Sequence, residues 1–289
     1  MISTKLTELL LVGDVRESLK ELPDRSVHCC VTSPPYWGLR DYGNDGQIGL
    51  ESTPQEFVDS LVAVFREVKR VLRDDGTLWI NLGDSYMGDD LVGIPWRVAF
   101  ALQADGWYLR QDIIWNKPNP MPESVRDRCT KSHEYIFLLT KQPKYYYDDQ
   151  AIQEDAKTKA GATWQERKAA GATAGNVIVG DGTRNGTQRV VHGKGVTSNL
   201  TRQDGKRNRR SVWTVTTTPF KGAHFVTLPT ALIEPCILAG CPEGGTVLDP
   251  FFGVGTTGLV AKQHGRGWVG IELNPEYAEI AKARIGAQQ

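Results

Sequence analysis

Along the chain, short apolar runs alternate with segments whose apolar residues recur at helical spacing. The runs predict strands at residues 8–12, 27–32, 77–82, 107–115, 135–140, 246–249 and 268–272. Helices are expected between them, at residues 15–22, 54–72, 93–106, 230–239, 258–264 and from 275 onward. Strands that alternate with helices in this order predict an α/β fold built on a parallel sheet.

The start of the helix at residue 54 carries the clearest local signal. Thr53 and Glu56 have the spacing of a capping box, and Pro54 occupies the first helical position. Asn274 followed by Pro275 repeats this kind of helix start near the other end of the chain. The Asp74-Asp75-Gly76 segment is expected to end the first of these helices, before a strand that begins at residue 77.

Residues 149–210 lack the periodicity of the rest of the chain and are rich in Gly, Thr, Asn, Gln and Arg. Residues 151–210 hold five lysines and seven arginines against five acids, although the whole chain balances 34 basic against 34 acidic residues. A local excess of positive charge favours a polyanionic partner. We interpret 149–210 as a region inserted into one domain, whose two halves are residues 1–148 and 211–289.

The cysteines and the N-terminus bear on the compartment. The five cysteines form no CxxC pair, and no His cluster has zinc-ligand spacing, so buried thiols of a reducing cytosol and no metal site are expected. No signal peptide precedes the first strand, and no apolar run approaches the roughly 20 residues of a membrane span. These features predict a cytoplasmic protein.

Ser33-Pro34-Pro35-Tyr36 directly follows the strand predicted at residues 27–32. In an open α/β sheet, ligands bind at the carboxyl ends of the strands. The two prolines fix the backbone and donate no N–H, which leaves the Pro34 carbonyl free to accept a hydrogen bond. Together with Ser33 Oγ it could accept both hydrogens of an exocyclic base amine and restore the nucleophilicity of the nitrogen, while Tyr36 stacks on the base.

The second motif, Asp249-Pro250-Phe251-Phe252-Gly253-Val254-Gly255-Thr256-Thr257-Gly258, follows the strand at residues 246–249. Its glycines satisfy the dinucleotide pattern G-x-G-x-x-G, and Glu272 lies 19 residues after the first of them. A nicotinamide dehydrogenase is disfavoured because only 17 residues follow Glu272, and because Asp249 would face a pyrophosphate. S-Adenosylmethionine fits better: Asp249 could hold its ammonium, and Glu272 could accept both ribose hydroxyls.

Together these motifs resemble the amino-methylating DNA methyltransferases of the β arrangement, in which the catalytic motif precedes the cofactor motif. The resemblance covers nearly the whole chain. It implies a Rossmann-like, S-adenosylmethionine-dependent methyltransferase sheet of seven strands in permuted order, beginning at the family's third and fourth strands and ending with its first and second. In this family, the place of residues 149–210 is that of an inserted target-recognition region.

The resemblance also assigns roles to single residues. The catalytic motif would be Ser33, Pro34, Pro35 and Tyr36, and residues 114–118 through 133–134 would surround the target base. The cofactor would contact Asp14, which faces its adenine, and His224, Asp249, Phe251, Gly253, Gly255, Thr256, Thr257 and Glu272. The basic run near the end of the insertion is expected to contact DNA phosphates through Lys206, Arg207, Arg209 and Arg210.

The target base follows from the first residue of the catalytic motif. In such enzymes a serine there occurs mostly with cytosine N4 and an aspartate mostly with adenine N6, so Ser33 favours cytosine N4. Adenine N6 is the alternative, since both amines need only two acceptors and a stacking ring. Methylation at carbon 5 is disfavoured because it needs a nucleophilic cysteine, and the Pro235-Cys236 pair lies on a predicted core helix.

The implied partner is duplex DNA, from which the target base must be flipped into the site. The resemblance further suggests a bacterial or phage enzyme and a cognate restriction endonuclease that acts on the same site. Two other hypotheses remain: a non-catalytic DNA-binding protein with a methyltransferase fold, and methylation of an amine on RNA or on a protein glutamine. The intact Ser33, Asp249 and Glu272 count against the first, and the large basic insertion counts against the second.

Overall fold

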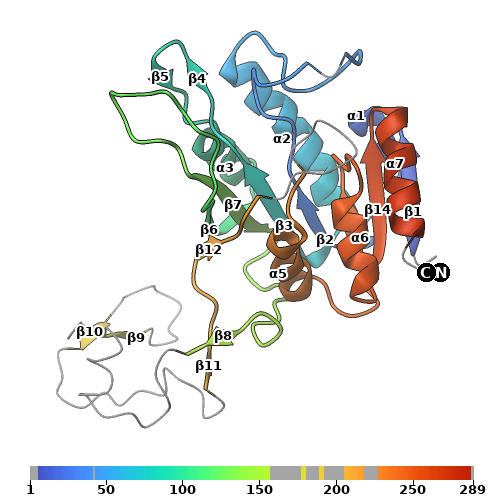
Figure 1. Ribbon diagram of the computed structural model, residues 1–289. Helices are drawn as coiled ribbons and strands as arrows, with labels where there is room; N and C mark the ends of the chain where they lie inside the picture. Colours follow the sequence, from blue (N-terminus) through green and yellow to red (C-terminus); the bar gives the residue numbers. More distant parts are fainter. Residues whose placement is uncertain are drawn as a thin grey trace. The chain divides into compact units, whose positions relative to one another are not determined.

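The computed structural model describes residues 6–41, 43–156, 177–179, 189–191, 205–217 and 227–287. The chain divides into two compact units (Figure 1). The first consists of Met1–Ala151 and Arg210–Gln289, and the second of Ile152–Arg209. The first unit holds both motifs, so its sheet determines how their residues meet.

An eight-stranded sheet forms the centre of the first unit. In spatial order its strands are β1 (Glu8–Val12), β14 (Gly267–Glu272), β13 (Thr246–Asp249), β2 (Val27–Thr32), β3 (Leu72–Leu82), β7 (His133–Thr140), β6 (Tyr108–Asn116) and β12 (Val212–Thr214). The strands from β1 to β3 are parallel to one another, whereas β7 is antiparallel to both of its neighbours. The expected parallel sheet is therefore mixed, and β12 adds an eighth strand to the seven expected.

The permuted strand order is confirmed. The first strand of the chain pairs along its whole length with the last one, from Glu8 opposite Trp268 to Val12 opposite Glu272. β13 lies between β14 and β2, so the two strands that come last in the chain separate the two that come first. Because β13 continues into a helix on one face and β2 into a helix on the other, a crevice opens between their carboxyl ends.

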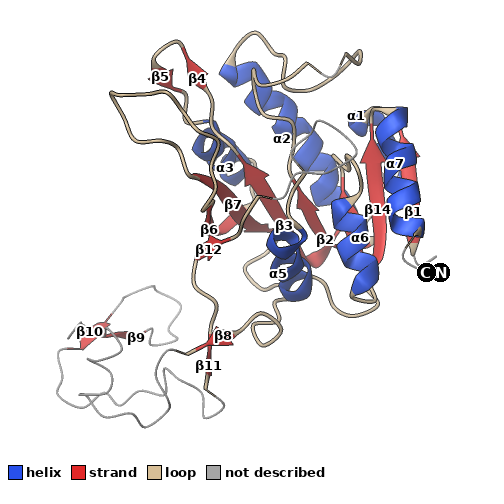
Figure 2. Cartoon of the chain, in the orientation of Figure 1, coloured by secondary structure: helices blue, strands red, loops and turns tan. Residues whose placement is uncertain are grey.

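Helices cover both faces of this sheet (Figure 2). One face carries α1 (Val15–Ser18), η1 (Leu19–Glu21), α2 (Pro54–Val71) and α3 (Ile94–Ala104), whose apolar residues join the buried cluster on β2, β3, β13 and β14. The other face carries α5 (Thr230–Gly240), α6 (Thr256–Gln263) and α7 (Pro275–Gly286). Gly240 of α5 packs so tightly on β3 that a Cβ there would lie 2.4 Å from Thr77 Oγ1.

The capping box that begins α2 is present, but the helix ends differently from the expectation. Glu56 N donates to Thr53 Oγ1 at 3.2 Å, and Thr53 N donates to Glu56 Oε2 at 3.1 Å. The chain is already extended at Leu72, so β3 starts before the Asp74-Asp75-Gly76 segment expected to precede it. Pairing with β2 explains this: the register shifts between Val27 and Cys29 and accommodates the additional residues of β3.

Three two-stranded antiparallel sheets complete the described structure. β4 (Tyr86–Met87) pairs with β5 (Asp90–Leu91) in the first unit. In the second unit, β8 (Glu154–Asp155) pairs with β11 (Lys206–Arg207), and β9 (Val177–Val179) pairs with β10 (Arg189–Val191). None of the helices in the described ranges is both long and apolar enough to cross a membrane.

Candidate active site

The carboxyl edge of the sheet gathers the two sequence motifs. Ser33 follows β2, and Asp249 and Glu272 are the last residues of β13 and β14. β7 runs in the opposite direction, so Glu134 at its start lies at this same edge, beside the end of β6. Strands that end together place residues distant in sequence around one crevice.

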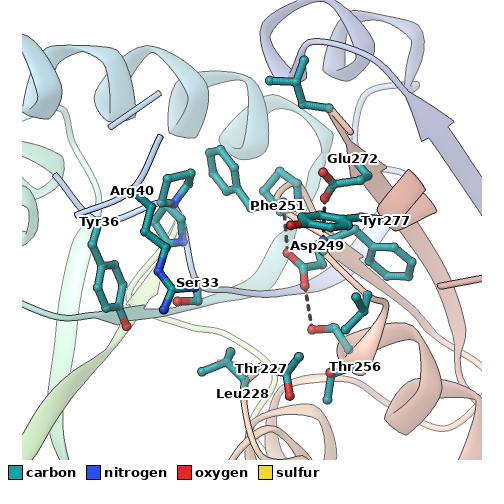
Figure 3. Close-up of a pocket in the computed structure, with 18 of the residues that line it drawn as sticks. Ser33, Tyr36, Arg40, Thr227, Leu228, Asp249, Phe251, Thr256, Glu272 and Tyr277 are labelled. Carbon is teal, nitrogen blue, oxygen red and sulfur yellow. Dashed lines mark hydrogen bonds between the residues drawn. The ribbon is translucent and has the colours of Figure 1, made fainter. Parts of the chain in front are cut away.

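This crevice is a cavity of about 470 Å³ in the first unit. In Figure 3, Ser33 and Tyr36 lie on one side, Glu272 and Tyr277 lie on the other, and Asp249 lies between them. The predicted residues that line it are Asp14, Ser33, Pro34, Pro35, Tyr36, Asp249, Phe251, Gly253, Thr256, Thr257 and Glu272. The structure therefore brings the catalytic and the cofactor motif to a single cavity, of a size typical of small-molecule sites.

Tyr36 is held in place at both its ring and its hydroxyl. The hydroxyl donates to Glu134 Oε2 at 2.7 Å and accepts from Asn81 Nδ2 at 2.6 Å. The ring lies against Gly83, where an added Cβ would be 2.4 Å from it. Asn81 Nδ2 also approaches Ser33 Oγ at 3.5 Å, so one side chain of β3 contacts both ends of the catalytic motif.

Glu134 connects this cluster to a cation. Its Oε1 is ion-paired with Lys117 Nζ, while Oε2 accepts from Asn81 Nδ2 at 2.8 Å as well as from Tyr36. The side chains of Lys117 and Glu134 are only 16% and 14% exposed. Lys117 Nζ also lies 4.3 Å from the ring centroid of Trp115, a cation–π distance. The pairing of Lys117 with Glu134 restrains both side chains in a largely buried wall, and the pair itself carries no net charge.

Asp249 is buried and bound by several donors. Oδ1 accepts from Thr32 Oγ1 at 2.6 Å and from Phe251 N at 3.1 Å, and Oδ2 accepts from Thr257 Oγ1 at 2.7 Å. Burial nevertheless raises the pKa of Asp249 to about 7. Since a carboxylate oxygen has two lone pairs, Oδ2 retains room for one further donor, such as the ammonium expected from the sequence.

Glu272 is oriented by backbone groups on both sides. Oε2 accepts from Gly253 N at 2.6 Å and Oε1 accepts from Asn274 N at 2.9 Å. Burial raises the pKa of this carboxyl above its usual value, although these backbone hydrogen bonds act against the rise. Because Glu272 lines the cavity, its carboxylate can also accept from a ligand, which suits the bidentate contact with two ribose hydroxyls that the sequence predicts.

The glycines of the second motif have different tasks. Gly253 has a φ of +52° and no atom within 4 Å of the position that a Cβ would take, so its backbone faces open space beside the cavity. Gly255 and Gly258 of the motif, together with Gly270 of β14, surround the ring of Phe252. An added Cβ would come within 3.2, 2.6 and 2.5 Å of this ring, respectively. Gly255 does not line the cavity, and it serves the packing of the loop against α7.

Asp14 begins α1 at the cavity wall. Its Oδ1 accepts from Arg16 N at 2.8 Å, and its carboxylate is ion-paired with the Arg16 guanidinium. The hydrogen bond from the Arg16 side chain is the main reason why the pKa of Asp14 lies below its usual value. His224, also expected at the cofactor, lies outside the described residues.

Two of the basic residues expected to contact DNA take part in ion pairs. In the second unit, Lys206 Nζ lies 2.5 Å from Asp155 and Arg207 Nε lies 2.9 Å from Glu154. Their contact with DNA stays a prediction, as does that of Arg209 and Arg210. None of the cysteines lines the cavity; Cys236, the residue considered for carbon-5 chemistry, is buried on α5.

Several residues that line the cavity, or that contact its lining residues as Asn81 does, had no assigned role in the sequence analysis. Lys117 and Glu134 fell within the segment expected around the target base, without individual functions. Asn81 and Tyr277 were not singled out, although Asn81 stands near the end of a strand predicted beside the catalytic motif. A polar residue at the end of an apolar strand was the available signal.

Comparison with known proteins agrees with this geometry. A family model described as DNA methylase matches residues 27–283. The chain is 48% identical to the Type II methyltransferase M.Cfr9I of Citrobacter freundii, over 96% of this chain and 87% of the relative. It is 46% identical to the Type II methyltransferase M.SmaI of Serratia marcescens, over 96% and 90% of the two chains.

Solved structures show the same fold. The Thermus thermophilus protein TTHA0409, solved in complex with S-adenosyl-L-methionine, is 29% identical and matches 97% of this chain and 95% of its own with a TM-score of 0.62. The PvuII DNA methyltransferase (cytosine-N4-specific) is 20% identical and matches 96% of this chain and 86% of its own with a TM-score of 0.68. The expected cofactor, S-adenosylmethionine, agrees with these matches. Matched by the family model along most of its length, the chain belongs to the N6/N4 DNA methylase family.

Proposed function

We propose that this DNA methyltransferase transfers a methyl group from S-adenosylmethionine to the exocyclic N4 amine of cytosine in duplex DNA. One observation carries the proposal: the Ser33-Pro34-Pro35-Tyr36 motif, the buried carboxyl of Asp249 and the half-buried carboxyl of Glu272 line one cavity of about 470 Å³. The motif that can hold an amine and the two carboxyls that can hold a nucleoside carrying an amino acid thus border the same cavity.

The residues around the cavity fit S-adenosylmethionine. Gly253 leaves open space beside its backbone, and Glu272, held by the backbone N–H groups of Gly253 and Asn274, lines the cavity as an acceptor. Asp249 keeps one acceptor position for an ammonium, and the rings of Phe251 and Tyr277 border the cavity. When bound there, the cofactor supplies an activated methyl group on its sulfonium sulfur.

The catalytic motif prepares the amine. Ser33 Oγ and the Pro34 carbonyl accept its two hydrogens, which draws the nitrogen lone pair out of conjugation with the ring. The nitrogen then forms a bond to the methyl carbon while the carbon–sulfur bond breaks with its electron pair on sulfur, and the nitrogen releases one proton to solvent. Tyr36, held by Glu134 and Asn81, offers a fixed ring face for stacking of the base.

Cytosine is favoured over adenine by Ser33, since the resemblance associates serine at this position with cytosine N4. The same two acceptors serve an adenine amine equally well, so N6 methylation is the second candidate. Both reactions require a base flipped out of the duplex, and the basic insertion, residues 149–210, is the region that we expect to hold the opened DNA.

We further propose a role in restriction and modification, with a cognate restriction endonuclease acting on the same site. The 48% and 46% identical relatives are both named as Type II methyltransferases. Methylation of the recognition site would then protect the host DNA from cleavage.

The test is the identity of the methylated nucleoside. Purified protein is incubated with labelled S-adenosylmethionine and mixed-sequence duplex DNA, and the DNA is digested and analysed by mass spectrometry. N4-Methylcytosine is the expected product, whereas N6-methyladenine would retain the chemistry and overturn the base assignment. If the cofactor binds but no nucleoside is labelled, parallel reactions with RNA and protein substrates decide between another amine and a purely DNA-binding role.

A further inference from the structure

The wall of the cavity that holds Tyr36 carries a cation with no task in the chemistry described above. Lys117 lines the cavity, and its ammonium is ion-paired with Glu134 and lies over the ring of Trp115. A lysine ammonium has three N–H donors and no acceptor. Glu134 occupies one of them, so Lys117 can offer another to a ligand in the cavity.

The surrounding hydrogen bonds leave Lys117, rather than Glu134, able to contact a ligand. Glu134 Oε2 already accepts from Tyr36 and Asn81, and Oε1 accepts from Lys117. Because the carboxylate is occupied by internal donors, it acts as the anchor and counter-charge of Lys117. The Lys117–Glu134 pair therefore presents a hydrogen-bond donor without adding net charge, in the same cavity as the acceptors at Ser33 and Pro34.

Cytosine and adenine differ where such a donor would meet them. When the exocyclic amine is held by Ser33 and Pro34, the next position along the base edge is a ring nitrogen acceptor in both bases. The position after that is the O2 carbonyl in cytosine but a C–H group in adenine. A largely buried ammonium donates a hydrogen bond to the O2 carbonyl of cytosine. Against the C–H group of adenine it loses its hydrating water and gains no hydrogen bond in return.

We propose that Lys117 is the residue that selects cytosine, by donating a hydrogen bond to O2 of the flipped base. This inference rests on the proposed function, because it requires an amine-methylating site. Lys117 thus supplies the base discrimination that the two acceptors at Ser33 and Pro34 cannot supply, and Glu134 positions Lys117 and Tyr36 together.

The experiment compares two duplexes that carry the site mapped for the wild-type enzyme and differ only in the base at the methylated position, cytosine or adenine. Single-turnover rates and kcat/KM are measured for wild type and for Lys117→Met. The variant is expected to lose roughly 10- to 100-fold in kcat/KM on cytosine, the size of one charge-assisted hydrogen bond, and less than about threefold on adenine. The preference for cytosine then collapses.

Further variants distinguish a contact of Lys117 with the base from a purely structural role of Lys117. Lys117→Met leaves a mostly buried Glu134 carboxylate unpaired, so the double variant Lys117→Met/Glu134→Gln tests the same loss in a neutral wall. Glu134→Gln alone should keep the cytosine preference, because Lys117 remains. Lys69→Met is the matched control, since Lys69 also lies over an indole ring, that of Trp107 at 5.5 Å, but does not line the cavity.

Each outcome supports the assignment or overturns it. A collapse of the cytosine-to-adenine ratio in both Lys117 variants supports it. An equal fall on both bases would show that Lys117 acts only through Tyr36, and an unchanged rate would show that it does not touch the base. N6-Methyladenine as the wild-type product would overturn the assignment of Lys117 and the choice of cytosine as the target base, but would leave the amine-methylating chemistry in place. A wild-type enzyme that labels no nucleoside would overturn the proposed function as a whole.

Discussion

The Thr32 hydroxyl donates a hydrogen bond of 2.6 Å to Oδ1 of Asp249, across 217 positions of sequence. Thr32 is the last residue of β2, directly before the catalytic motif, and Asp249 is the last residue of β13, directly before the glycine loop. Both side chains are buried, and they lie where two neighbouring parallel strands end. One hydrogen bond thus ties the start of the catalytic motif to the start of the loop expected to bind the cofactor.

Asp249 should make the stability of the ligand-free protein depend on pH. Its pKa is raised to about 7 in the fold by burial, against an unfolded value near 4. Between these values the folded state binds the additional proton, so the free energy of unfolding should fall as the pH rises from about 4 to about 7 and level off above. Asp249→Asn should reduce this change in the free energy of unfolding by a few kcal/mol, because each unit of pKa shift corresponds to about 1.4 kcal/mol. Urea midpoints at about pH 5 and about pH 8 measure it.

The difference between wild type and Asp249→Asn isolates this residue. Glu272 also has a raised pKa, and its contribution, of the same sign, remains in both proteins. A wild type and a variant whose midpoints change in parallel with pH would show that Asp249 ionises normally in the fold.

Replacing Glu272 should weaken the binding of the cofactor and leave the binding of DNA unchanged. Glu272→Ala removes the acceptors for the ribose and releases Gly253 N and Asn274 N, so the Kd for S-adenosylmethionine should rise roughly 10- to 100-fold. Calorimetric titration measures this, and a DNA retention assay without cofactor should be unchanged. Glu276→Ala, an exposed acid of the same region, is the control. Equal losses of cofactor and DNA binding would contradict a ribose role.

Gly270 should not tolerate even one methyl group. A Cβ there would lie 2.5 Å from the Phe252 ring, so Gly270→Ala should lower the free energy of unfolding by about 1–3 kcal/mol. Phe252→Leu in the same protein should restore part of the loss by vacating space. Gly286→Ala, where nothing lies within 4 Å of an added Cβ, should be close to neutral in the same urea titrations. Similar losses in the two alanine variants would refute the packing argument.

The catalytic motif predicts a graded series of rates. Ser33→Ala should lower the single-turnover rate about 10- to 1,000-fold, because one acceptor of the amine is removed. Tyr36→Phe keeps the stacking ring and removes only its hydroxyl contacts with Glu134 and Asn81, so its loss should be smaller than that of Tyr36→Ala. Full activity in a protein without both Ser33 Oγ and the Tyr36 ring would rule out the proposed chemistry.

The basic residues near the end of the insertion should determine part of the salt dependence of DNA binding. Replacing Lys206, Arg207, Arg209 and Arg210 by glutamine should reduce the slope of log K against log salt by about 0.9 for each phosphate that is no longer neutralised. Asp155→Asn removes the ion-pair partner of Lys206 and should strengthen DNA binding instead. Lys282→Gln, an exposed lysine paired with Glu279 on α7, is the control. A slope that stays constant in the fourfold variant would exclude these residues as phosphate ligands.

Residues next in sequence to a strand could be placed at the site from the sequence. Ser33, Asp249 and Glu272 follow or end apolar runs that are strands in the structure, and parallel strands bring their ends together. The permuted order of the sheet was also predicted, as what the resemblance to the β-arranged DNA methyltransferases implies. Local patterns suffice where a short segment and its strand determine the position.

Residues whose role depends on a distant partner could not be placed in this way. Glu134 reaches Tyr36 only because β7 is antiparallel, and the alternation of strands and helices gave no sign of that reversal. Gly258 belongs to the glycine pattern of the second motif and Gly270 lies within a predicted strand, and in the structure both leave room for the ring of Phe252. The sequence held these residues, but tertiary packing decided what they contact.

The interleaved strand order has a consequence for synthesis on the ribosome. β1 has no neighbour until β14 exists, and β2 lacks its neighbour on one side until residue 246 begins β13. The nascent chain must therefore carry unpaired strand edges through most of translation, a state that invites aggregation or chaperone binding. It also means that a chain truncated before residue 246 lacks Asp249 and Glu272, so incomplete products should be unable to methylate DNA.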